Sequence, residues 1–199
     1  MRFVLLAGIA ASFAMGAIEV VRYPPLLAQP GGRVFMIEAA VALLVYAALI
    51  AAADGPSRQA TFGLIAAAIQ TAHLLTENTA HFGIGVTIAF MLATFTVWGV
   101  AGYRAGGVVP GLLAGVWSAV ATMSLVVAIG FAVEFYWIVP KPAEVIMWGE
   151  FQRSGWSDVR AFTIANTLDS AFSHLLIGPI VGAVVGIIGG AIGRVRESR

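Results

Sequence analysis

Residues 174–192 read HLLIGPIVGAVVGIIGGAI, a stretch without aspartate, glutamate, lysine or arginine. A helix needs about 20 apolar residues to cross the hydrocarbon core of a bilayer, and this stretch with its upstream flank supplies them. Gly178, Gly182, Gly186 and Gly190 are each four residues apart, so they share one stripe of such a helix. Helices associate in lipid through close contact of small residues. We therefore expect the stripe to pack on another helix, whether of the same chain, of a second copy in a homo-oligomer or of a membrane-protein partner.

The composition of the whole chain agrees with a membrane protein. Of its 199 residues, 60% are hydrophobic and 11% are charged, whereas a soluble domain has roughly 25% charged residues. The net charge is +1 and no basic patch carries interleaved aromatic residues, which argues against a nucleic-acid partner. The chain has no cysteine, so disulfides, thiolate metal sites and thiol nucleophiles are excluded.

Six apolar stretches are long enough to cross a bilayer. We expect an all-α integral membrane protein of a cell inner membrane, a single domain whose six-helix transmembrane bundle is surrounded by lipid. The last span is too long for one straight crossing, so we expect either that Pro179 kinks it or that its first turns project above the membrane. An aromatic segment between the fifth and sixth spans is expected to lie on the membrane surface. The predicted spans are about 3–21, 34–53, 59–75, 83–103, 112–137 and 161–192.

The arginines and lysines beside the spans indicate the orientation of the bundle. Six of them would lie on the side of both termini, and five on the other, where three share one longer loop. Since basic residues in short loops favour the cytoplasm, we expect the N-terminus and the C-terminus to be cytoplasmic.

Ionisable residues continue the small-residue stripes of three spans. Glu19 follows Gly16 by three residues, Glu134 follows Gly130 by four, and His174 precedes Gly178 by four. These side chains are therefore expected to point into the bundle, in its outward half. An ionisable residue within a membrane span is a candidate functional site, and Glu19, Glu134 and His174 are the predicted ligand- or ion-binding residues.

A second pattern lies at the end of the third span. His73, Glu77 and His81 are spaced by four residues, and two such side chains of one helix can bind the same metal ion. They form a predicted divalent-metal site if the helix continues past Leu75. His73 and His174 are, alternatively, the candidate axial ligands of a b-type haem.

Three functions remain open at this point. The first is a small transporter, or an ion- or proton-handling protein, with its polar site in the outward half. The second is an accessory or assembly subunit of a larger membrane complex. The third is a metal- or haem-dependent redox protein. The sequence contains no HExxH, GxSxG or P-loop motif and no lysine within a span, so enzyme function is not indicated.

Overall fold

A computed structural model describes residues 1–53, 60–80, 84–138 and 148–197. The described part of the chain is 93% helical and contains no strand. Five helices are long and apolar enough to cross a membrane, and in α4 the described apolar part is the shorter stretch Thr61–Thr76. Each of the six predicted spans coincides largely with one long helix. The long helices are α1 (Arg2–Arg22), α3 (Pro30–Ala52), α4 (Ala60–Ala80), α5 (Ile84–Ala105), α6 (Val108–Val133) and α8 (Val159–Glu197); the short ones are α2 (Pro25–Ala28), the π-helix η1 (Glu134–Ile138) and α7 (Trp148–Ser154).

The outer surface of these helices is apolar. Several large apolar side chains are more than half exposed, among them Ile37 and Leu44 of α3 and Ile180, Ile188 and Ile192 of α8. In a protein dissolved in water so large an apolar surface would drive aggregation. In a bilayer it faces hydrocarbon, which identifies a membrane protein.

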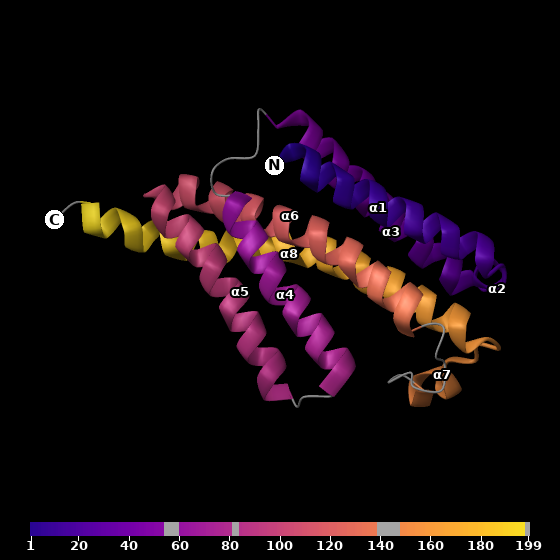
Figure 1. Ribbon diagram of the computed structural model, residues 1–199. Coiled ribbons are helices and arrows are strands. Elements are labelled where there is room, and N and C mark those ends of the chain that lie inside the picture. The colour runs from indigo at the N-terminus through magenta and orange to yellow at the C-terminus, as the bar shows by residue number, and fades with distance from the viewer. Residues whose placement is uncertain (54–59, 81–83, 139–147, 198–199) are drawn as a thin grey trace.

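Helix α6 is the central element of the bundle. Of its most apolar window, 56% is buried, compared with 33% or less for each of the other four candidate spans. It packs on α1, α4, α5 and α8, and the long α8 also packs on α3 and α5. Figure 1 shows the α1–α3 pair on one side of α6 and α8, and the α4–α5 hairpin on the other. The free end of that hairpin diverges from the α2 end of the α1–α3 pair (Figure 1).

The glycine stripe of α8 packs on α6 of the same chain. A Cβ added to Gly182 would lie 2.6 Å from the carbonyl oxygen of Gly115 and 2.7 Å from the Cβ of Ala119. A Cβ added to Gly186 would lie 2.9 Å from the Cα of Gly115, and Gly190 meets Gly107 and Gly111 in the same way. The two backbones are therefore in direct contact. The glycine stripe, for which a partner protein or a second copy was also considered, is covered by α6 of the same chain.

Helix α8 continues through Pro179 because a neighbouring side chain replaces the hydrogen bond that proline cannot make. Proline has no N–H, so the carbonyl of residue i−4, here Leu175, loses its partner within the helix. The hydroxyl of Tyr46 in α3 donates to the Leu175 oxygen at 2.7 Å, and both residues are buried. This bond ties α3 to α8 at the proline.

A buried threonine joins three helices on the other side of α6. The indole nitrogen of Trp98 in α5 donates to the Thr122 hydroxyl at 3.1 Å. That hydroxyl lies 2.7 Å from the carbonyl oxygen of Ser118 and 3.2 Å from that of Gly63 in α4. The junction sets the position of the α4–α5 hairpin on α6.

Replacing Thr122 by valine is expected to lower the free energy of unfolding by about 1–2 kcal/mol, because the buried Trp98 N–H loses its acceptor while the shape is kept. Thr96→Val is the matched control, since the exposed Thr96 hydroxyl donates to the carbonyl of Leu92 in its own helix. Denaturant titration in detergent micelles measures both variants. Equal stability of the two would contradict a structural role for the junction.

Candidate functional site

Glu19 is the most deeply buried acidic side chain among the described residues. It has no exposed surface, although it lies only one turn from the end of α1. Its Oε1 atom is 3.0 Å from a guanidinium nitrogen of Arg22, whose side chain is 52% exposed. Its Oε2 atom is buried and has no hydrogen-bond partner within the described part of the chain. One carboxylate oxygen therefore forms an ion pair with a partly exposed arginine, and the other is buried without a hydrogen-bond partner among the described residues.

The register between α1 and α6 brings Glu134 to the same level. A Cβ added to Gly8 would lie 2.8 Å from the carbonyl oxygen of Ser124, and one added to Gly16 would lie 3.9 Å from the ring of Phe131. The two helices therefore run in parallel. Three residues beyond Gly16 is Glu19, and three residues beyond Phe131 is Glu134.

Glu134 stands where α6 changes from an α-helix to the π-helix η1. Its backbone N–H is shared between the carbonyls of Gly130 and Phe131. Its side chain is half-buried. Short π-helical segments in α-helices are frequent at functional sites, and the sequence pattern did not indicate this one.

His174 lies elsewhere, and the expectation that it points into the bundle is wrong. The residue is exposed, and its Nδ1–H donates to the carbonyl of Ser170 at 2.7 Å. A step of four residues turns a helix by about 40° more than one full turn. The stripe that is buried from Gly190 to Gly178 has therefore rotated out of the interface at His174.

His73 is held against α5. Its Nε2 lies 3.3 Å from the Thr87 hydroxyl, and its ring packs on Phe90 with centroids 5.2 Å apart. His73 and His174 thus have separate surroundings, which does not support a haem between them. The predicted haem site has no other support in the described contacts.

The predicted metal site His73, Glu77 and His81 is only partly described. Helix α4 does continue past Leu75 to Ala80, as the spacing requires. The side chain of Glu77 and the whole of His81 lie outside the described residues, so this site stays a prediction. Within the described part of the chain, no three histidine, aspartate or glutamate side chains come together as metal ligands.

The structure thus brings Glu19 and Glu134 to one level on adjacent helices and leaves His73 and His174 apart from them. Glu19 is near the α2 end of α1, whereas His73 is towards the free end of the hairpin, and Figure 1 shows these ends diverging. Among the predicted site residues that the structure describes, a single shared polar layer is not formed.

Comparison with known proteins adds no constraint on this site: a scan of family models, a search of curated proteins and a search of solved structures each found no match.

Proposed function

We propose that this chain is a six-span protein of the cell inner membrane, with both termini in the cytoplasm, that handles protons or small monovalent cations at Glu19. The observation that carries the proposal is the buried Oε2 of Glu19, an acidic oxygen without a hydrogen-bond partner among the described residues. In the proposed orientation Glu19 and Glu134 belong to the outward half of the bundle.

The geometry favours a proton over a divalent metal at this place. A divalent cation such as Ca²⁺ or Mg²⁺ takes six or more oxygen ligands, and the described residues bring no three acidic or histidine side chains together. A proton needs one carboxylate oxygen only. Arg22 balances the charged form of Glu19 through Oε1, so a proton can bind at or leave Oε2 with its counter-ion already in place.

Arg22 also connects the carboxylate of Glu19 with water, through the other oxygen, Oε1. Its guanidinium is in contact with Glu19 and its side chain is half exposed. The ring of Tyr23 lies 6.0 Å from the guanidinium carbon, an aromatic surface beside the cation. Water at the end of α1 therefore reaches the partner of Glu19 without crossing apolar packing.

The experiment is proton flux into proteoliposomes under an imposed membrane potential, followed with an entrapped pH dye. The wild-type protein is expected to exceed empty liposomes. Glu19→Gln, which keeps the shape but binds no proton, is expected to lower the rate at least about tenfold, the effect of losing about 1.4 kcal/mol at the rate-limiting step. Repeating the assay with Na⁺ or K⁺ gradients separates proton from cation flux.

The matched control is Glu150→Gln, which removes an exposed carboxylate of α7. It is expected to leave the flux unchanged. Wild-type flux no greater than that of empty liposomes for every ion, or equal flux in Glu19→Gln and wild type with both variants folded, would reject the proposal.

A second candidate function is that of an accessory or assembly subunit of a membrane complex. It is favoured by the divergence of the α4–α5 hairpin, which leaves Ile84 at its free end 78% exposed (Figure 1). Such a subunit would copurify in stable stoichiometry with partner proteins after mild solubilisation. A stable monomer that conducts protons would instead support the first function.

A further inference from the structure

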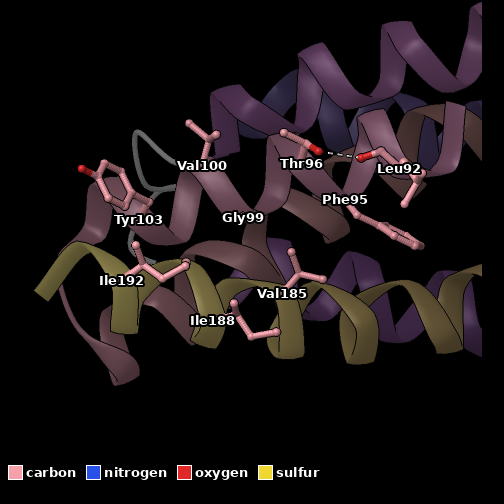
Figure 2. A pocket seen from close by; sticks show the side chains of 10 residues that line it. Leu92, Phe95, Thr96, Gly99, Val100, Tyr103, Val185, Ile188 and Ile192 are labelled. Atoms are coloured by element: carbon pink, nitrogen blue, oxygen red, sulfur yellow. Dashed lines mark hydrogen bonds between the residues drawn. The ribbon is translucent and has the colours of Figure 1, made fainter. Parts of the chain in front are cut away.

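An apolar groove runs between α5 and α8, at the end of the bundle opposite Glu19. Its volume is about 430 Å³. Figure 2 shows the side chains that form its walls and the close approach of the two helices at Gly99. A Cβ added to Gly189 would clash with the Gly99 carbonyl, so the backbones close the floor of the groove. The walls include Leu92, Phe95 and Val100 of α5, and Val185, Ile188 and Ile192 of α8.

The chemistry of the lining fits a hydrocarbon chain. Thr96 is the one hydroxyl along the walls before Tyr103, and it already donates to the Leu92 carbonyl at 2.8 Å (Figure 2). Apart from Thr96 and Tyr103, the residues that line the groove have apolar side chains or are glycine. A polar ligand would therefore lose its hydration without gaining hydrogen bonds there.

The length of the groove matches one leaflet of a bilayer. From Leu92 to Tyr103 is eleven residues of helix, about 16 Å, which is about half of the roughly 30 Å hydrocarbon core. One lipid tail from one leaflet would fill it. A transmembrane helix of a partner protein would instead need a contact surface along the full thickness.

A basic residue stands at the end of the α5 wall of the groove, at the level where a lipid headgroup would lie. Arg104 follows Tyr103 and is exposed, with its guanidinium 5.4 Å from the ring centroid of Phe62. Across the described side chains of this end of α5 and α8, no acidic residue opposes it. This charge favours an anionic headgroup.

We propose that the groove binds an anionic phospholipid, with one acyl chain between α5 and α8 and its phosphate beside Arg104. The site is independent of Glu19 and of the proposed proton flux. It makes the close contact of α5 with α8 sensitive to the lipid composition of the leaflet at the C-terminal end of α8.

The test is native mass spectrometry of the full chain in detergent, titrated separately with phosphatidylglycerol and phosphatidylcholine of equal tails. Wild-type protein is expected to bind one phosphatidylglycerol in preference to phosphatidylcholine. Ile188→Trp, which fills the groove from an exposed position, is expected to weaken phosphatidylglycerol binding at least about fivefold, because the indole ring excludes CH₂ groups of the acyl chain from the groove.

Two further variants complete the experiment. Ile180→Trp is the matched control, because Ile180 is equally exposed on α8 but outside the groove, and it should bind as the wild type does. The variant Arg104→Gln should lose about fivefold in affinity for phosphatidylglycerol, which is the effect of about 1 kcal/mol for one arginine near an anionic surface, and keep its affinity for phosphatidylcholine.

Equal binding of the two lipids by the wild type would overturn the proposal, as would wild-type affinity in Ile188→Trp. A dimer that Ile188→Trp disrupts would also overturn it, because the occupant would then be a second copy of the chain.

Discussion

Gly186→Ala is expected to lower the free energy of unfolding by about 1–3 kcal/mol, the usual cost of overpacking a close-packed interface. The added Cβ would lie 2.9 Å from the Cα of Gly115 and closer still to the Gly111 carbonyl oxygen. All of these neighbours are backbone atoms of α6, so no rotamer change relieves the clash. The helices themselves must separate, and the dispersion contacts along both backbones weaken together.

Gly130→Ala is the matched control for this prediction. Gly130 lies in α6 as well, and a Cβ added there meets no other described residue within 4 Å. Its stability is expected to be unchanged or raised by up to about 1 kcal/mol, because alanine loses less backbone entropy than glycine in a helix. Thermal unfolding in detergent compares the two variants. A Gly186→Ala protein as stable as Gly130→Ala would contradict direct backbone contact between α6 and α8.

Tyr46→Phe is the second large effect. Removing the hydroxyl leaves the buried Leu175 carbonyl without the donor that Pro179 cannot supply. An unsatisfied buried carbonyl costs about 1–3 kcal/mol, and measured values for bonds between membrane helices lie towards the lower end. We expect a loss of about 1–2 kcal/mol in the free energy of unfolding, measured by denaturant titration in micelles.

A double-mutant cycle makes this prediction specific. Pro179→Ala restores a backbone N–H that can bond to Leu175 within α8. In that background Tyr46→Phe should cost clearly less than in the wild type, because the carbonyl then keeps one partner. If Tyr46→Phe costs the same in both backgrounds, the tyrosine stabilises the protein through its ring packing and not through the proline-freed carbonyl.

Some of this arrangement could be read from particular residues. The four-residue spacing from Gly178 to Gly190 predicted a close helix contact, because helical periodicity is a local property of the chain. The same logic placed Glu19 inside the bundle. The spacing rule failed at His174, one turn before Gly178 in α8. The small excess rotation of each four-residue step accumulates along the stripe, and only the neighbouring helix determines where burial stops.

The hydrogen bonds between helices could not be predicted from the sequence. A proline in the middle of a helix leaves the carbonyl four residues earlier without its hydrogen-bond donor. Pro179 therefore identifies Leu175 as a residue that needs a donor, but it does not identify the donor. Tyr46 is 129 residues away in sequence, and no spacing rule connects the two. Thr122 and Trp98 are likewise joined across helices, and neither lies in a recognisable motif.

The sequence by itself determined that this protein is helical, apolar on its surface and suited to a membrane, because these follow from composition and from the lengths of uncharged stretches. Only the tertiary structure decided that α6 covers the glycines of α8, that Glu19 keeps one buried oxygen open, and that an apolar groove remains between α5 and α8. The physical reason is that each of these depends on which helices become neighbours and in which register. An apolar helix face is equally stable against lipid and against another helix. Which helices pack together therefore depends on close contact between their backbones and on a few buried hydrogen bonds between residues distant in sequence.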